Sequence, residues 1–167
     1  KRWTSYYMER YPNQEFYKDA QMLYESLSQS YDVDSLAIGV LLPLSGSYKA
    51  YGDQLKRGLS LVPMQNIKLF VEDVGDSPQA AENAVHRLVK NHKVVAIMGP
   101  LSSKTSQAAA TAAQPYQVPI IIWSASEGMT QQGDYVFRNG LTKSEQAVGL
   151  AYLAYEILNI KRMAILY

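Results

Sequence analysis

From residue 36 onward, short apolar segments alternate with amphipathic ones, and this alternation constrains the fold more than any other feature of the chain. Strand-like apolar runs occur at 36–42, 67–72, 94–98, 118–123 and 135–137, and the first four are separated by stretches with helical spacing. Parallel strands joined by helices form a sheet that is covered on both faces. The sequence therefore predicts an α/β fold, a doubly wound parallel sheet with strand order 2-1-3-4-5.

The clearest helix follows the second strand, where Ser77 can cap a run of apolar residues at helical spacing. The residues expected to face the sheet are Ala80, Ala81, Ala84, Val85, Leu88 and Val89. Another helix, expected at 142–158, opens with a capping box formed by Thr142 and Glu145. We expect this helix, and a strand at 163–167 after it, not to extend the first sheet.

Residues 1–34 differ from the rest of the chain, because they are rich in aromatic residues at helical spacing. Trp3, Tyr7 and Tyr11 recur every four residues, and a second apolar stripe follows a Pro-Asn break. This pattern predicts a helical hairpin, with residues 30–35 as a linker. Since so short a hairpin buries little apolar surface, we expect it to dock on a preceding helical array.

Composition excludes several classes of partner and chemistry. Sixteen Lys and Arg residues balance fifteen Asp and Glu residues without a basic block, so nucleic acid is not an expected partner. The apolar runs are far shorter than the ~20 residues of a spanning helix, so no membrane span is expected. The chain has no cysteine, which removes disulfides, thiolate metal sites and thiol nucleophiles.

Motifs for catalysis are incomplete or absent. Residues 99–105 resemble a phosphate-binding loop, but Ser103 stands where a glycine is required before Lys104. There is no G-x-S-x-G nucleophile elbow, and His86 and His92 have no partner at metal-ligand spacing. We therefore expect no enzyme activity, no catalytic residue, no metal and no cofactor.

Small hydroxyl residues gather where three predicted strands end. They are Ser45 and Ser47 after the first strand, Ser102 and Ser103 after the third, and Ser124 and Ser126 after the fourth. In a doubly wound sheet these loops converge at the switch point, where ligands bind. Free amides at the start of the helix near Thr105, with the hydroxyls of Ser102 and Ser103, are suited to hold a carboxylate.

A structural role explains each of these residues equally well when it is taken alone. Serines before a helix or in a turn act as caps and turn formers. Tyr48 and Tyr51 either form an aromatic wall of the site or pack on their own domain. The shared position of the hydroxyls at one end of the sheet favours a binding site.

Several motifs, in this order, resemble those of one family. They are residues 38–46 (IGVLLPLSG), 51–52 (YG), 72–73 (ED), 99–103 (GPLSS), 123–126 (WSAS) and 129–130 (MT). Together they are similar to the type I periplasmic binding proteins of the branched-chain amino acid receptor family. The resemblance covers residues 36–167, and residues 136–139 (VFRN) resemble the family's crossing into a second lobe.

The resemblance implies a domain organisation and a ligand site. Residues 35–140 would form lobe one of a ligand-binding domain, and 141–167 the start of lobe two, most of which lies outside this chain. Ser103 matches a hydroxyl that contacts the ligand carboxylate, the 124–126 loop presents backbone and hydroxyl groups, and Tyr51 matches an aromatic of the first loop. The ligand-binding set expected is Ser47, Tyr51, Ser102, Ser103, Ser124, Ala125 and Ser126.

Two functions are compatible with this resemblance. The first is an extracytoplasmic receptor that binds a small amino-acid-like or amide solute between two lobes, for transport with an ABC transporter permease or for sensing. The second is an envelope lipoprotein that activates a penicillin-binding protein, because such lipoproteins join tetratricopeptide-like helices, similar to residues 1–34, to this fold. Both imply a periplasmic or cell-envelope location, with a lipoprotein anchor in the full-length protein.

Overall fold

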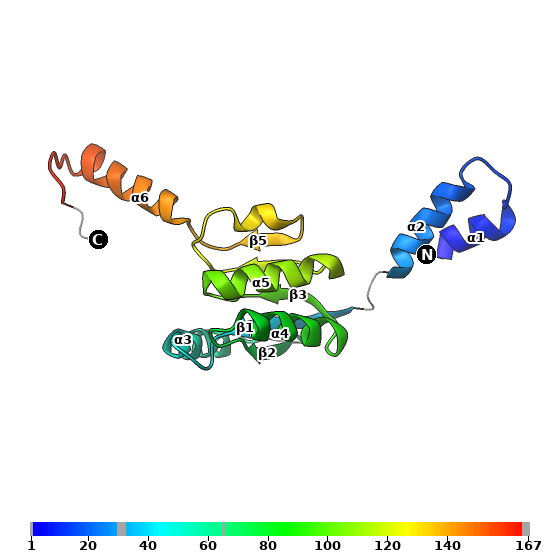
Figure 1. Cartoon of the computed structure of the whole chain (residues 1–167), viewed down its shortest axis with the longest axis horizontal. Helices are drawn as coiled ribbons and strands as arrows, with labels where there is room; N and C mark the ends of the chain where they lie inside the picture. The colour runs from blue at the N-terminus through cyan, green and yellow to red at the C-terminus, as the bar shows by residue number, and fades with distance from the viewer. Residues whose placement is uncertain (1, 30–32, 65, 165–167) are drawn as a thin grey trace.

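The computed structural model describes residues 2–29, 33–64 and 66–164. Within these residues, five strands form one parallel sheet in the order β2-β1-β3-β4-β5 (Figure 1). The strands are β1 (Asp34–Leu42), β2 (Lys68–Asp73), β3 (Val94–Met98), β4 (Ile120–Ile122) and β5 (Val136–Arg138). The predicted fold class and strand order are confirmed.

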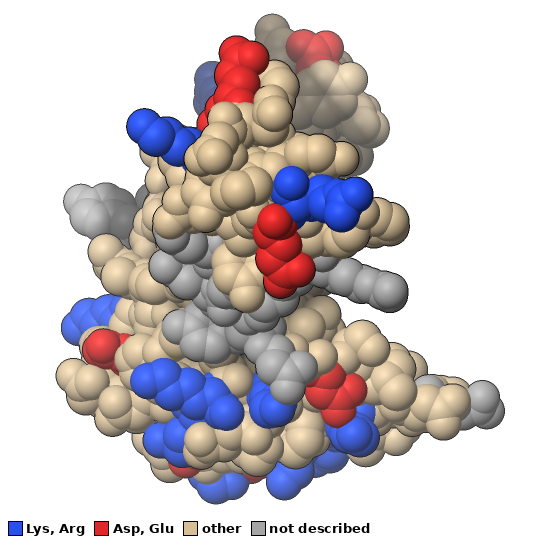
Figure 2. All heavy atoms as spheres, turned by 90° about the vertical axis from the view of Figure 1, so that its right-hand side faces the viewer, with Lys and Arg blue, Asp and Glu red and all other residues tan. Residues whose placement is uncertain are grey.

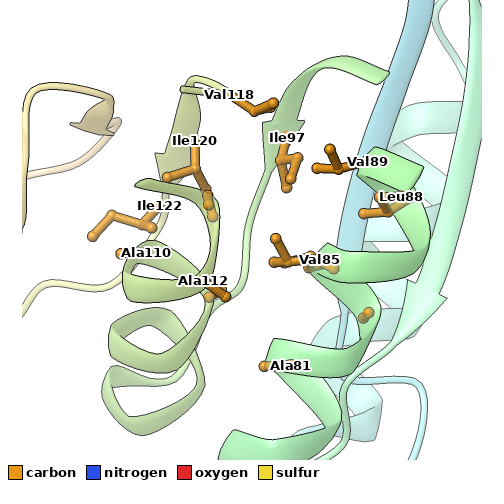
Figure 3. Close-up of a cluster of buried hydrophobic side chains, with 14 of the residues drawn as sticks. Ala81, Val85, Leu88, Val89, Ile97, Ala110, Ala112, Val118, Ile120 and Ile122 are labelled. Carbon is orange, nitrogen blue, oxygen red and sulfur yellow. The ribbon is translucent and has the colours of Figure 1, made fainter. Parts of the chain in front are cut away.

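Helices α4 (Pro78–Lys90) and α5 (Ser103–Ala113) lie side by side on one face of this sheet (Figures 1 and 3). Figure 3 shows Val89 of α4 pointing toward Ile97 of β3 within a cluster of fully or almost fully buried apolar side chains. The Ser77 hydroxyl accepts a hydrogen bond from the Ala80 amide at 3.3 Å, which confirms the predicted cap. The apolar stripe of α4 is buried as predicted, except that Ala80 at its margin is only half-buried.

Helix α3 (Lys49–Ser60) covers part of the opposite face. The chain moves toward one edge of the sheet from β1 to β2, and toward the opposite edge from β2 to β3. Right-handed crossovers therefore place α3 on the face opposite to α4 and α5. Val40 and Leu42 of β1 are fully buried on this second face. Farther along the same face, Leu36 is 45% exposed and Phe137 is 50% exposed, so its cover is incomplete.

The two faces of the edge strand β2 are covered to different extents. Ile67, Leu69 and Val71 alternate with Lys68 and Phe70, a pattern typical of one buried apolar face. In the structure Phe70 packs against the core under α4 and stacks on the His92 ring at 4.1 Å between ring centroids. Ile67 and Val71 are 38% and 39% exposed, because their side of the sheet is the incompletely covered one.

The N-terminal hairpin consists of α1 (Arg2–Arg10) and α2 (Tyr17–Gln29), which pack on each other and lie apart from the sheet (Figure 1). The expected linker, residues 30–35, is shorter than predicted, because β1 already begins at Asp34. Asp34 donates its amide to the Lys93 carbonyl, and its carboxylate accepts hydrogen bonds from Lys68 and the Leu36 amide. Residues 30–32 of the linker lie outside the described residues.

Beyond β5, helix α6 (Lys143–Tyr152) runs away from the sheet and continues into a π-helical turn, η3 (Leu153–Ile157) (Figure 1). The capping box of Thr142 and Glu145 is formed as predicted. Most apolar side chains of this segment are exposed, among them Leu150 at 66%. Of the strand expected at 163–167, residues 163–164 are not in a strand, and 165–167 lie outside the described residues.

The face shown in Figure 2 carries charges of both signs. On this face, Lys and Arg side chains lie among Asp and Glu side chains, with uncharged surface between them. In the described part of the chain, no helix has the length and apolar character needed to cross a membrane.

The packing of α4 on β1 gives a direct test of the core. Leu88 is fully buried, and its side chain fills the space beside Gly39, where an added Cβ would lie 2.7 Å from Leu88 Cδ1. We expect Leu88→Ala to lower the free energy of unfolding by about 2 to 5 kcal/mol, measured by urea denaturation, because it leaves a cavity under α4. Leu61→Ala is the control: Leu61 is 83% exposed, so a comparable loss there would contradict this account of the core.

Candidate functional site

Three loops meet at the carboxyl ends of β1, β3 and β4, the place where ligands bind in doubly wound sheets. Close backbone approach requires glycine at two points of this region. A Cβ on Gly99, whose φ is +90°, would lie 2.3 Å from the Leu41 carbonyl oxygen. A Cβ on Gly52 would lie 2.1 Å from the Pro43 carbonyl oxygen, so α3 packs directly against the end of β1.

Ser103, Ser124 and Ser126 form a hydroxyl cluster at this edge of the sheet. The Ser103 hydroxyl contacts the Ser126 hydroxyl and lies 3.3 Å from the Ser124 hydroxyl. Ser124 is almost fully buried, and its hydroxyl accepts the Ser126 amide at 3.2 Å. The structure therefore brings together three of the residues expected in the site, one from the first turn of α5 and two from the loop after β4.

Ser102 has the structural role that the sequence left open. It is the N-cap of α5, and its hydroxyl accepts the Thr105 amide at 3.3 Å and lies 2.7 Å from the Thr105 hydroxyl. No described residue accepts a hydrogen bond from the next two amides, those of Ser103 and Lys104. These two donors face the end of the helix, where an anion is favoured.

A hollow of about 380 Å³, the polar depression, lies beside the hydroxyl cluster. It is lined by Ser47, Tyr48, Asp76, Ser102, Ser103 and Lys104. Ser47, Ser102 and Ser103 were expected in the site, whereas Asp76 and Lys104 were not. The depression is open to solvent, and its charged side chains are exposed.

Tyr51 does not line the polar depression. It borders a neighbouring apolar groove of about 410 Å³ together with Leu55 and Leu59 of α3 and with Leu101 and Trp123. Its ring lies 6.2 Å from that of Tyr48, which does line the depression. The aromatic wall expected of the two tyrosines is thus divided between two adjacent hollows.

The carbonyl of Ala125, the remaining expected residue, accepts the Lys143 amide at 3.2 Å. The same loop is held at two other points. Arg138 donates to the Ser126 carbonyl at 3.5 Å, and the Glu127 carboxylate accepts the Ser144 amide at 3.2 Å. The 124–126 loop therefore connects the hydroxyl cluster to the start of α6.

Two carboxylates hold the first loop, residues 43–48 between β1 and α3, in place. The sequence-based interpretation missed this role. From the sequence, Asp73 and Asp76 are interpreted as part of a turn that approaches a helix, because carboxylates are favoured near a helix N-terminus. In the structure, Asp73 accepts the amides of Leu44, Ser45 and Gly75 at 2.8, 3.2 and 2.9 Å, and Asp76 accepts the Ser47 amide at 2.7 Å. The predicted pairing of β1 with β2 could have indicated this role, since it places the residues after β2 beside the loop after β1.

The hydrogen bonds of Asp73 change its acidity. Partial burial would raise the pKa of this carboxyl, but hydrogen bonds from the Ser45 hydroxyl and from the amides of Gly75, Leu44 and Ser45 outweigh burial and hold the pKa below its usual value. Asp73 is therefore ionised near neutral pH and acts as a fixed acceptor for the first loop.

Among the described residues, no group of three or more His, Asp or Glu side chains is placed to hold a metal ion. His86 Nδ1 lies 2.7 Å from the Tyr116 hydroxyl, and His92 stacks on Phe70. Both histidines thus have structural contacts away from the hydroxyl cluster. The chemistry that this site offers is hydrogen bonding and charge.

A parallel sheet of this order, with hydroxyl groups gathered at the ends of β3 and β4, is typical of α/β proteins that bind small ligands. A family model described as periplasmic binding protein matches residues 35–167. The chain belongs to the periplasmic binding protein family. No curated protein matches the chain by sequence.

Solved structures support the same fold. The leucine-binding protein LivK of Thermotoga maritima is 28% identical, with a TM-score of 0.63 over 74% of this chain and 38% of that protein. LivJ of Streptococcus pneumoniae, a branched-chain amino acid transporter substrate-binding protein solved with isoleucine, is 27% identical, with a TM-score of 0.64 over 75% of this chain and 39% of that protein.

A more distant structure shares the fold alone. An ABC transporter solute-binding protein of Rhodopseudomonas palustris, solved with 4-hydroxybenzoate, is 23% identical, with a TM-score of 0.64 over 74% of this chain and 36% of that protein. This periplasmic binding protein chain therefore spans less than two fifths of the length of these solved relatives.

The hydrogen bonds by which Asp73 holds the first loop can be tested through the free energy of unfolding. We expect Asp73→Asn to lower the free energy of unfolding at pH 7 by about 1 to 3 kcal/mol, because three amides lose a charged acceptor. The pKa of Asp73 is lowered in the folded protein, so its stabilisation is present above the unfolded value of about 3.9 and is lost as the pH falls through the folded pKa.

Urea denaturation of both proteins between pH 7 and pH 2.5 is the measurement, and the difference between them should shrink at the acid end. Asp53→Asn is the matched control, because among the described residues Asp53 forms an ion pair with Lys49 alone, one turn away on the exposed surface of α3. A pH-independent difference for Asp73→Asn would contradict the role of its carboxylate.

Proposed function

We propose that this chain is the first lobe of an extracytoplasmic ligand-binding receptor, which binds a small amino-acid-like or amide solute in a cleft between two lobes for ABC transport or sensing. The observation that carries the proposal is the hydroxyl cluster of Ser103, Ser124 and Ser126 beside the unpartnered amides at the start of α5. These hydroxyl and amide groups are donors suited to an anion. Small side chains also let a ligand approach the main chain closely.

The geometry suits a carboxylate as the part of the ligand bound by this lobe. The amides of Ser103 and Lys104 point out of the helix end, where the helix dipole favours negative charge. The Ser103 hydroxyl adds a donor from the same turn, and the Ser126 hydroxyl adds one from the neighbouring loop. The solved relatives supply a parallel, since isoleucine and 4-hydroxybenzoate both carry a carboxylate.

The remaining assignments follow from the family and stay proposals for this chain. Residues 35–140 form lobe one, and residues 141–167 begin lobe two. The protein performs no catalysis, resides in the periplasm or cell envelope with a lipoprotein anchor, and delivers its solute to an ABC transporter permease. Closure of two lobes around the solute excludes water and completes a site of which this lobe contributes one side.

The test is calorimetric titration of amino acids into the protein with both lobes present. We expect the double variant Ser103→Ala with Ser126→Ala to bind at least about tenfold more weakly, because a hydrogen bond to a charged group contributes about 1.5 to 3 kcal/mol. Ser60→Ala is the matched control, since the Ser60 hydroxyl donates a hydrogen bond to the Arg57 carbonyl at the far end of α3, away from the hydroxyl cluster. Unchanged affinity in the double variant would reject this site.

The hairpin favours a second candidate, an envelope lipoprotein module that activates a penicillin-binding protein in peptidoglycan synthesis. Trp3 and Phe16 are 80% and 61% exposed, and with Leu23 they line an apolar hollow on the hairpin, which suits it to a protein contact or to a tetratricopeptide-like array. We expect Trp3→Ser with Phe16→Ser to abolish binding to the penicillin-binding protein in a purified two-component assay. If this variant still binds the penicillin-binding protein fully, and the protein binds amino acids in the titration above, the activator function is rejected and the receptor function stands.

A further inference from the structure

The polar depression carries two charges of opposite sign that are not paired with each other. Asp76 comes from the loop after β2, and Lys104 from the first turn of α5, and both line the hollow with Ser47 and Ser103. In the part of the chain that the structure describes, neither side chain forms an ion pair. Both charges are therefore available to a ligand in the depression.

Asp76 is fixed in its place by two contacts. One carboxylate oxygen, Oδ2, accepts the Ser47 amide at 2.7 Å. The same carboxylate packs over Gly46, where an added Cβ would lie 2.5 Å from Oδ2, and the φ of Gly46 is +75°. The other oxygen, Oδ1, accepts no hydrogen bond from a described residue. The loop thus holds a negative charge at the depression with one oxygen available.

We infer that Asp76 and Lys104 determine specificity, and that they select a ligand with a cationic group beside its anionic group over a ligand that is only an anion. The inference rests on the proposed function and narrows its solute to a zwitterion. Lys104 attracts the carboxylate of the ligand, whereas Asp76 pairs with its ammonium group. A plain carboxylate in the same position is still attracted by Lys104, but it has no ammonium group to pair with Asp76, which repels its negative charge.

Two probes with one carbon skeleton separate these effects. L-Isoleucine is the zwitterion, and 3-methylpentanoate is the same molecule without its amino group. Titration calorimetry of the two-lobed protein should show isoleucine binding more tightly than 3-methylpentanoate. We expect Asp76→Asn to weaken isoleucine about tenfold and to leave 3-methylpentanoate unchanged or stronger, because only the zwitterion loses an ion pair.

Lys104→Gln provides an independent arm, and it should weaken both probes, because both carry the carboxylate. Asn at position 76 keeps an oxygen for the Ser47 amide, so the loop keeps its attachment. Asp53→Asn, outside the depression, should change neither affinity. A general disturbance of the fold would weaken both probes alike and cannot weaken isoleucine alone.

Each outcome decides between the inference and the proposed function. If Asp76→Asn weakens both probes equally, or neither, the specificity role is overturned while amino acid binding stands. If wild-type protein binds 3-methylpentanoate as tightly as isoleucine, the selection of a zwitterion is likewise overturned. If wild-type protein binds neither probe and no other amino acid, both the inference and the proposed amino acid site are rejected.

Discussion

Leu88 of α4 packs onto β1 at the point where Gly39 has no side chain, and the layered structure depends on this contact. It brings α4 close to β1, and the buried side chains of α5, β3 and β4 continue the same core. Glycine recurs where β3 ends, because Gly99 lies against the Leu41 carbonyl. Close packing around β1 therefore sets the positions of the loops that follow β1 and β3.

The first loop owes its conformation to charge rather than to apolar packing. Asp73 and Asp76 accept amides of residues 44, 45 and 47, so the loop is attached to the end of β2 by carboxylates of a different segment. Such attachments suit a binding surface, because ionised acceptors orient backbone groups without filling the space that a ligand needs. The lowered pKa of Asp73 also makes its attachment to the loop sensitive to acid, unlike the apolar core below it.

The hydroxyl cluster lies at the carboxyl ends of the strands, next to apolar surface that the described part of the chain leaves exposed. The 124–126 loop bonds to the first residues of α6, which leads away from the sheet with most of its apolar side chains exposed. The apolar groove beside Trp123 and the partly covered second face of the sheet have the same character. Exposed apolar surface of this extent is typical of contact sites.

The sequence by itself determined the alternation of strands and helices, the strand order and the cap at Ser77, because local periodicity and turn chemistry act over a few residues. It also indicated that Ser103, Ser124 and Ser126 meet, since parallel strands end at one edge. Only the tertiary structure decided that Phe70 rather than Val71 faces the core, that Tyr51 borders a separate groove, and that Asp76 and Lys104 share the depression. These outcomes depend on which side of each strand is covered and on contacts between segments far apart in the chain, and periodicity carries no information about either.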